Sequence, residues 1–201
     1  MVVIGLTGSI GMGKSTTARF FAEAGVPVHE ADLVVHRLYA GEAAPMIEAE
    51  FPGVTTAEGV DRSKLARRVL DDPEALRRLE SIVHPLVRRE EMRFLREADQ
   101  AGAPIVVLDI PLLFETGADR RVDAVAVATA PADIQRARAF ERAGMTEEKF
   151  QTLLAKQMPD ADKRRRADFV VDTSQGFDSA RLQVRAILRA ASTLPIRRDP
   201  L

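Results

Sequence analysis

Cysteine and asparagine are both absent from this chain of 201 residues. Without cysteine the chain forms no disulfide, offers no thiolate nucleophile and cannot supply cysteine ligands to zinc or iron–sulfur clusters. Without asparagine it cannot carry the N-K-x-D motif by which GTPase switches usually recognise guanine. The missing asparagine and the 24 arginines against 5 lysines fit a GC-rich genome, which we favour, or selection against thermolabile residues.

Long apolar runs and an excess of one charge are also missing. No stretch approaches the roughly 18 consecutive apolar residues that a membrane-spanning helix requires. The start, MVVIGLTGSIGMGKST, lacks the basic region and long apolar segment of a signal peptide. The formal net charge of -1 at pH 7 gives no general attraction to nucleic acid or to an anionic membrane. We therefore expect a cytoplasmic protein that binds neither nucleic acid nor a membrane. We also expect a monomer rather than an oligomer.

The overall composition is typical of one folded domain. Hydrophobic residues make up 46% and charged residues 29%, both close to globular averages. A chain of this length buries one full core and has room for an inserted subdomain. We predict a core of residues 1–40, 103–135 and 167–191, a helical insertion at about 41–102, a lid at about 136–166 and a tail at 192–201.

Strand and helix patterns alternate in the predicted core. Short aliphatic and β-branched runs of this kind are typical of a buried parallel sheet. The expected strands are Val2 to Thr7, Val26 to Val28, Ile105 to Ile110, Asp123 to Thr129 and Phe169 to Asp172. Helical spacing is found at Ser15 to Glu23, Asp32 to Tyr39, Pro131 to Arg142, Met145 to Met158 and Phe177 to Ala190. The fold class is α/β, a five-stranded parallel sheet with helices on both faces.

The segment from Ala43 to Ala101 is helical almost throughout and shows no clear strand. We expect breaks near Pro52 to Gly59, at Asp72-Pro73 and at His84-Pro85, where proline or glycine interrupts the pattern. The tail from Ser192 has no periodicity, and we expect it to fray.

The strongest motif follows the first predicted strand. Gly8, Gly13, Lys14 and Ser15 fit G-x-x-x-x-G-K-[ST], with a strand before the loop and a helix after it. Glycines let the backbone N–H groups wrap a β-phosphate, which a Cβ would obstruct. Lys14 adds positive charge at the β- and γ-phosphates, and the Ser15 hydroxyl can ligate Mg²⁺. The sequence therefore predicts a phosphate-binding loop for ATP, with a plain glycine-rich turn as the alternative.

Two carboxylates stand at the ends of predicted strands, where α/β sheets bind ligands. Asp32 follows the second strand and could accept the proton of an attacking hydroxyl, or merely cap the next helix. Asp109 ends the run VVLD and could hold the water shell of a metal ion, or be another helix cap. Both alternatives stay open for each residue. The chain is short for a hydrolase motor, so a small-molecule kinase fits best.

In order, these motifs resemble those of the dephospho-CoA kinase family. GLTGSIGMGKST is followed by HEAD, VHPLV, DIPLLFE, R-A-F-E-R and ADFVVDTS, and the resemblance covers about Val3 to Arg189. It implies a P-loop NTPase-type core with a helical acceptor-binding insertion and a helical lid. It also implies ATP-dependent, Mg²⁺-assisted phosphorylation of the ribose 3′-hydroxyl of dephospho-CoA, the last step of coenzyme A synthesis.

The resemblance assigns roles to single residues. Asp32 matches the general base, Lys14 the P-loop lysine and Arg138 a lid arginine placed against the phosphates. The implied nucleotide contacts are Gly8, Gly11, Met12, Gly13, Lys14, Ser15, Thr16, Arg142 and Asp172, with Ser15 and Asp109 at the metal. The implied acceptor site comprises Asp32, His84, Pro85, Pro111, Leu112, Leu113 and Glu115. A simple helix break at His84-Pro85 and core positions for the leucines remain alternatives.

The chain departs from the family pattern at two places. The family usually has D-A-D where this chain has E-A-D at 30–32, so a role for the first carboxylate must tolerate an extra methylene. The family often has Asp-Asn before a glycine, whereas Asp172 is followed here by T-S-Q-G, which leaves the adenine contacts open. We interpret the run Lys163 to Arg166 as a solvated helix face, with a part of the lid as the alternative. The rival functions are another small-metabolite kinase, of the nucleoside or shikimate type, and a regulatory nucleotide-binding protein without transfer activity.

Overall fold

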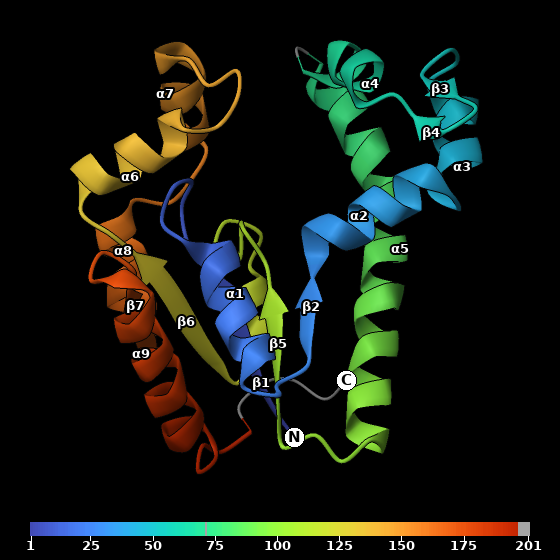
Figure 1. Ribbon diagram of the computed structural model, residues 1–201. Coiled ribbons are helices and arrows are strands. Elements are labelled where there is room, and N and C mark those ends of the chain that lie inside the picture. The colour runs from blue at the N-terminus through green and yellow to red at the C-terminus, as the bar shows by residue number, and fades with distance from the viewer. Residues whose placement is uncertain (71, 197–201) are drawn as a thin grey trace. The chain divides into compact units, whose positions relative to one another are not determined.

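A computed structural model describes residues 1–70 and 72–196 of the chain (Figure 1). The chain divides into two compact units. The first comprises Met1–His29 with Glu97–Leu201, and the second comprises Glu30–Arg96. The insertion predicted at about 41–102 thus corresponds to a unit that begins earlier. The reason is that the helix after the second strand packs its apolar side, Val34 and Leu38, into the hydrophobic cluster of the second unit.

The first unit contains a parallel sheet with strand order β2-β5-β1-β6-β7, which confirms the predicted α/β class. Its strands are β1 (Val2–Thr7), β2 (Val28–Glu30, which the unit boundary divides), β5 (Ile105–Asp109), β6 (Ala124–Thr129) and β7 (Phe169–Asp172). Its helices are α1 (Lys14–Glu23), the 3₁₀ helix Ala118–Arg121, α6 (Ala132–Phe140), α7 (Glu147–Ala155), α8 (Asp160–Arg166) and α9 (Gly176–Ala191). The aliphatic runs of the sequence form these strands because a central parallel strand is buried on both faces.

The strand β1 lies at the centre of the sheet. Its Val2 is paired with Ile105 of β5, and its Ile4 with Ala124 of β6. Alternate residues Val2, Ile4 and Leu6 join a cluster with residues of α1 and α9, so these two helices cover one face of the sheet. In a parallel sheet all carboxyl ends share one edge, and the loops that follow β1, β5, β6 and β7 therefore begin at that edge.

The second unit is mainly helical and has its own core. Its elements are α2 (Ala31–Ala40), α3 (Ala43–Glu50), β3 (Thr55–Thr56), β4 (Gly59–Val60), α4 (Arg62–Val69) and α5 (Pro73–Gln100), whose last residues belong to the first unit. The core comprises Val34, Leu38, Ala43, Ile47, Phe51, Val54, Leu65, Val69, Ala75, Leu79, Val83 and Leu86. The carboxylate of Asp61 caps α4, and that of Asp72 accepts hydrogen bonds from the first turn of α5.

Two predictions for the insertion are wrong. We expected no strand there, but β3 and β4 form a short antiparallel hairpin in which Thr55 is opposite Val60. We also expected a break at His84-Pro85, but α5 continues through Pro85. Pro85 is exposed, whereas Val83 and Leu86 on either side are buried in the core. Burial of the flanking residues holds the helix together where proline removes one backbone hydrogen bond.

The structure describes the first five residues of the predicted C-terminal tail. Residues 192–196 follow α9, and Leu194 packs against the core cluster of the first unit, so this part of the tail is anchored rather than frayed. The remainder of the predicted tail, residues 197–201, lies outside the described residues. Among the described helices, none has the length and apolar character needed to cross a membrane.

Candidate active site

The phosphate-binding loop connects β1 to α1, as predicted. The first residues of this segment lie in the loop after β1 and the last in the first turn of α1; the seven predicted residues are Gly8, Gly11, Met12, Gly13, Lys14, Ser15 and Thr16. Helix α1 begins at Lys14, and Gly13 precedes it with a φ of 81°. The first N–H groups of a helix have no partner within it and carry partial positive charge. The start of α1 can therefore bind a phosphate.

Two glycines of the loop combine a lack of space for a side chain with a positive φ. A Cβ on Gly11 would lie 2.4 Å from the carbonyl oxygen of Gln135, and one on Gly13 would lie 2.9 Å from Oγ1 of Thr173. Both glycines also have positive φ values, 77° and 81°, which other residues adopt only with strain. The close approach and the backbone conformation thus both require glycine.

Lys14 is paired with Asp109, the last residue of β5. Its Nζ donates a hydrogen bond to Oδ1 of Asp109 at 2.7 Å, and the Asp109 side chain is only 3% exposed. No α-helix begins directly after β5 in this described stretch, where the next element is the 3₁₀ helix at Ala118. The alternative role of Asp109 as a helix cap is therefore wrong. The pair places a carboxylate and an ammonium group at one end of the phosphate loop.

The peptide of Ile10, in the middle of the loop, is held by two glutamines. Its N–H donates to Oε1 of Gln157 at 3.1 Å, and its carbonyl accepts from Nε2 of Gln135 at 2.9 Å. Gln135 is buried on α6, and Gln157 lies between α7 and α8. The backbone N–H of Ala130 also lies 3.0 Å from Sδ of Met12. The loop is thus fixed from the segment between β6 and β7.

Arg138, on α6, is bound to the residue that follows β7. Its Nη1 donates to Oγ1 of Thr173 at 2.7 Å, and its Nη2 donates to the Thr173 carbonyl oxygen at 2.8 Å. Asp172 lies beside it, and the pKa of its carboxyl is lowered by hydrogen bonds from Ser174 and by the charge of Arg138. Arg142 is exposed in the turn after α6. The structure therefore brings Arg138 and Asp172 together, near the loop residues that Thr173 contacts.

Glu115 joins the segment after β5 to the segment after α7. Its Oε1 accepts a hydrogen bond from the Met158 N–H at 2.7 Å and lies 3.0 Å from Nζ of Lys163. Burial raises the pKa of Glu115, but hydrogen bonds from the Met158 and Glu115 backbone N–H groups and the ion pair with Lys163 outweigh it, and the pKa is lowered. Lys163 has no exposed surface. The expectation that the run from Lys163 to Arg166 is wholly solvated is therefore wrong at its first residue, because an ion pair compensates the buried charge.

The other acceptor-site residues predicted after β5 differ in their burial and contacts. The carbonyl oxygen of Pro111 accepts a hydrogen bond from the hydroxyl of Thr7 at 3.0 Å. Leu112 is exposed, whereas Leu113 is fully buried beside Gly5 of β1. For Leu113 the core position, which was the alternative, agrees with the structure.

Asp32 lies in the second unit, in the first turn of α2. The helix begins at Ala31 and its N-cap residue is Glu30, without a side-chain capping bond. Asp32 is therefore not the cap, and that alternative is wrong. Its side chain is exposed, which leaves the carboxylate accessible to a ligand.

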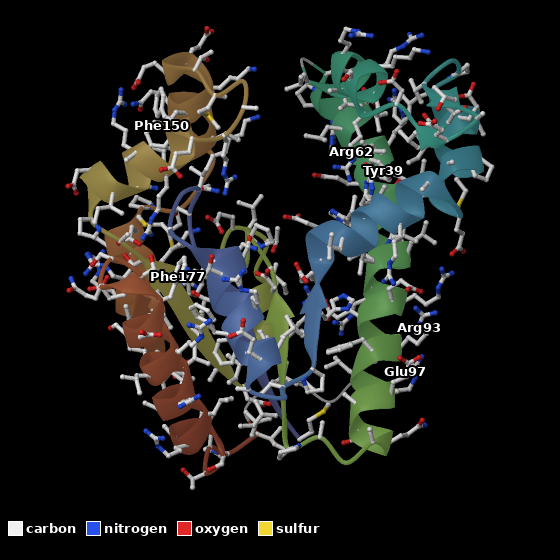
Figure 2. All side chains as sticks on the ribbon, viewed as in Figure 1. Tyr39, Arg62, Arg93, Glu97, Phe150 and Phe177 are labelled. Atoms are coloured by element: carbon white, nitrogen blue, oxygen red, sulfur yellow. The ribbon has the colours of Figure 1, made fainter. Side chains whose placement is uncertain are left out.

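Within this unit Asp32 lines a cavity of about 530 Å³. The other lining residues are Val35, Tyr39, Arg62, Leu65, Ala66, Val69 and Leu79. The guanidinium of Arg62 on α4 lies 5.5 Å from the ring centre of Tyr39 on α2, and Figure 2 labels both side chains. Burial raises the pKa of Tyr39, against the opposing charge of Arg62. The cavity thus combines an aliphatic wall, one cation and one carboxylate, whereas His84 and Pro85 are exposed on α5 and do not line it.

Comparison with known proteins identifies the family. The sequence profile described as dephospho-CoA kinase matches residues 2–179. The chain belongs to the dephospho-CoA kinase family. A dephospho-CoA kinase of Rhodopseudomonas palustris is 59% identical over 99% of this chain and 100% of its own length, and one of Brucella melitensis is 58% identical over 97% and 98%. The resemblance inferred from the motifs is thereby confirmed, and membership identifies the chain as an ATP-dependent kinase.

Solved structures agree with the family assignment. The crystal structure of a Thermus thermophilus protein, TT1252, superposes with a TM-score of 0.83 at 35% identity and covers 94% of this chain and 97% of its own. A dephospho-CoA kinase from Campylobacter jejuni has a TM-score of 0.64 at 22% identity, covering 94% and 96%. A shikimate kinase from Acinetobacter baumannii has a TM-score of 0.52 at 20% identity, covering 94% and 92%. The last two likenesses show the fold alone.

The motifs of the dephospho-CoA kinase family did not point to several residues of the site. Gln135, Gln157 and Thr173 support the phosphate loop, and Tyr39 and Arg62 line the cavity. A single glutamine or threonine in a helix or turn has no distinctive sequence signal. Of these five residues, only Thr173 stood out in the sequence, because it occupies the position where the family often has asparagine after the aspartate.

Proposed function

We propose that this chain transfers the γ-phosphoryl group of ATP to the ribose 3′-hydroxyl of dephospho-CoA, which gives coenzyme A and ADP. The observation that carries the proposal is the complete phosphate loop, with Lys14 paired to Asp109, in a chain of the dephospho-CoA kinase family. The phosphate loop and the family membership support different parts of this proposal. The loop supports a nucleoside triphosphate as donor, and the family supports the acceptor.

The first unit binds ATP in this proposal. The N–H groups at the start of α1 receive the phosphates, and Lys14 contacts them with its ammonium group. Mg²⁺, when bound, would be held by the Ser15 hydroxyl and through water by Asp109, and it would neutralise charge on the phosphates. The described residues contain no group of three or more carboxylate or histidine side chains that could hold a metal ion. This donor set fits Mg²⁺, which keeps several waters and takes few protein ligands when phosphates are bound.

The second unit binds the acceptor in its cavity. Dephospho-CoA has a long arm with aliphatic stretches between its amide groups, a pyrophosphate and a ribose, and the cavity offers an aliphatic wall beside Arg62 and Asp32. A guanidinium binds phosphate oxygens through two parallel hydrogen bonds, and an aliphatic wall suits the arm. We therefore propose these residues as the main acceptor contacts, and His84, Pro85, Pro111, Leu112 and Glu115 stay predictions.

The reaction is an in-line transfer. Asp32 accepts the proton of the 3′-hydroxyl as the bond from O3′ to the γ-phosphorus forms and the bond from that phosphorus to the β,γ-bridging oxygen breaks. Lys14 and Arg138 neutralise the charge that the transferred group and the departing ADP share. Because dephospho-CoA and ATP are small cytoplasmic metabolites, we propose action in the cytoplasm, by a monomer that needs no nucleic acid or membrane.

An acceptor panel tests the proposal. The pure protein is incubated with ATP and Mg²⁺ and with dephospho-CoA, shikimate, gluconate or a nucleoside in turn, and the release of ADP is followed. We expect acceptor-dependent ADP with dephospho-CoA alone. Faster turnover with another hydroxyl would assign the chain to a different small-metabolite kinase, and ADP release that no acceptor stimulates would favour a regulatory nucleotide-binding protein.

A further inference from the structure

The side chain of Thr173 contacts three separate parts of the first unit. Its Oγ1 lies 3.0 Å from the carbonyl oxygen of Met12, in the phosphate loop, and 3.2 Å from that of Thr129, at the end of β6. The same oxygen accepts the hydrogen bond from Nη1 of Arg138 at 2.7 Å. Thr173 is 9% exposed. One hydroxyl thus connects the phosphate loop, the sheet and the arginine.

The chemistry of a hydroxyl fixes the direction of these contacts. A guanidinium only donates, so Arg138 occupies a lone pair of Oγ1, and the hydroxyl proton is left for one of the two carbonyl oxygens. The Thr173 carbonyl accepts a second bond from Nη2 at 2.8 Å. Two of the five N–H groups of Arg138 are therefore engaged at fixed positions, and three are left for an anion.

The backbone of Thr173 is itself firmly held. Its N–H donates to the carbonyl oxygen of Thr129 at 2.9 Å, which continues the pairing of β7 with β6 beyond Asp172. A Cβ on Gly13 would meet Oγ1 at 2.9 Å, so the side chain also abuts the loop directly before Lys14. An arginine bound to this anchor is restricted in orientation, whereas an unanchored arginine samples many rotamers that must be ordered during the reaction.

We propose that Thr173 is a positioning residue for the phosphoryl transfer. Its hydroxyl and carbonyl orient the guanidinium of Arg138, and the same hydroxyl fixes that guanidinium relative to the Met12 peptide of the phosphate loop. The inference rests on the proposed role of Arg138 in neutralising phosphate charge. Thr173 acts through Arg138 and contacts no reacting atom in this assignment.

The test compares Thr173→Ser with Thr173→Ala, because both remove the methyl group and only alanine removes the hydroxyl. Each is made with and without Arg138→Ala, and kcat, the KM of each substrate and the melting temperature are measured. Thr193→Val, at an exposed hydroxyl after α9, is the surface control. We expect Thr173→Ala to lower kcat roughly 10- to 100-fold, the effect of one hydrogen bond to a charged group, and Thr173→Ser to remain within about threefold of the wild type.

The double variant decides the mechanism. If Thr173 acts through Arg138, Arg138→Ala with Thr173→Ala turns over as fast as Arg138→Ala alone. If Thr173→Ala lowers kcat by the same factor in the Arg138→Ala background as in the wild type, Thr173 supports only the loop and the proposal is wrong. An unchanged kcat of the single variant Thr173→Ala would also overturn the proposal. If Thr173→Ala does not fold, Thr173→Val carries the same comparison.

A second measurement separates this inference from the proposed function. The Kd of ATP is determined by calorimetry, without any acceptor, for the wild type, Thr173→Ala, Arg138→Ala and the double variant. A non-additive change in ATP affinity supports the coupling of Thr173 to Arg138 even if dephospho-CoA is not the acceptor. Additive changes in affinity together with additive changes in rate contradict it, whatever the acceptor.

Discussion

The Nζ of Lys14 and Oδ1 of Asp109 lie 2.7 Å apart, although they belong to segments 95 residues apart in the sequence. The Lys14 side chain is 15% exposed and that of Asp109 3%, so the pair is largely shielded from water. In such a place a lost partner leaves a poorly solvated charge behind, and the penalty is larger than for a surface pair. The lysine expected at the phosphates therefore also stabilises the folded chain.

Lys14→Ala is expected to impair catalysis and stability together. Turnover should fall by on the order of 10²-fold or more, because a cation is removed from the phosphates. The free energy of unfolding should fall by about 1–3 kcal/mol, since Asp109 loses its ion pair. Adding Asp109→Asn should recover much of the stability in a denaturant titration and none of the turnover. If Lys14→Ala alone has the wild-type kcat at saturating ATP, the phosphate loop does not take part in the transfer.

Gly11→Ala and Gly144→Ala form a matched pair, because both glycines have positive φ, 77° and 73°. A Cβ on Gly144 meets nothing within 4 Å, whereas one on Gly11 meets the Gln135 carbonyl. Each substitution should cost about 1–2 kcal/mol through the backbone conformation alone. Only Gly11→Ala should also displace the loop and weaken ATP binding by more than about tenfold. Calorimetry on both variants checks this, and equal ATP affinities would show that the close approach to Gln135 is unimportant.

Glu115→Gln should make the free energy of unfolding less dependent on pH in the acidic range. The pKa of Glu115 is lowered on folding, so its carboxylate stabilises the fold above the unfolded-state pKa of about 4.5, and this contribution is lost as the pH falls through the folded-state pKa. Glutamine can still accept from the Met158 N–H but leaves the buried Lys163 without its counter-charge.

The melting temperature of Glu115→Gln at pH 7 should therefore lie about 2–6 °C below the wild type, and the two should converge as the pH falls below the folded-state pKa of Glu115. Glu148→Gln, on the exposed side of α7, should show neither effect. A gap between Glu115→Gln and the wild type that persists unchanged at low pH would exclude the ion pair as its cause.

Asp32→Asn tests the proposed general base. A general base contributes typically 10²- to 10⁴-fold, so kcat should fall by about that factor while ATP binding is unchanged. Asp32 makes no N-cap, so Asp32→Asn and Asp32→Ala should both melt within about 2–3 °C of the wild type. Asp178→Asn, an exposed acid in the first turn of α9, is the matched control. If Asp32→Asn retains over half of the wild-type kcat, Glu30 and Asp109 become the next candidates.

The parts of the site that the sequence predicted are those fixed by short spacing. The phosphate loop is contained in eight consecutive residues, and the buried apolar run before Asp109 places a carboxylate at the sheet edge. Both follow from local rules, because phosphate binding needs glycines at set positions and a parallel sheet ends its strands at one edge. Asp32 follows the second strand, as the order of strand and helix in the sequence indicated, and its role as general base stays a prediction. The alternative that it caps α2 is wrong, because the N-cap residue is Glu30.

The parts that the sequence did not predict depend on contacts between distant segments. Gln157 reaches the loop across 147 residues and Thr173 across 161, so neither has a local pattern. The hairpin of β3 and β4 was missed because its strands have two residues each, too few for an alternating pattern. The break predicted at Pro85 failed because tertiary burial of Val83 and Leu86 outweighs the local cost of proline.

The position of the transferred phosphate tests the central claim most directly. The wild-type protein is incubated with ATP, Mg²⁺ and either dephospho-CoA or its 3′-deoxy analogue, ADP is quantified, and the product is examined by phosphorus NMR. The account predicts one ADP for each product molecule, a new phosphomonoester coupled to the ribose 3′-proton, and no ADP above background with the 3′-deoxy analogue. A phosphate at the 2′-position, or equal ADP release with the deoxy analogue, would contradict it.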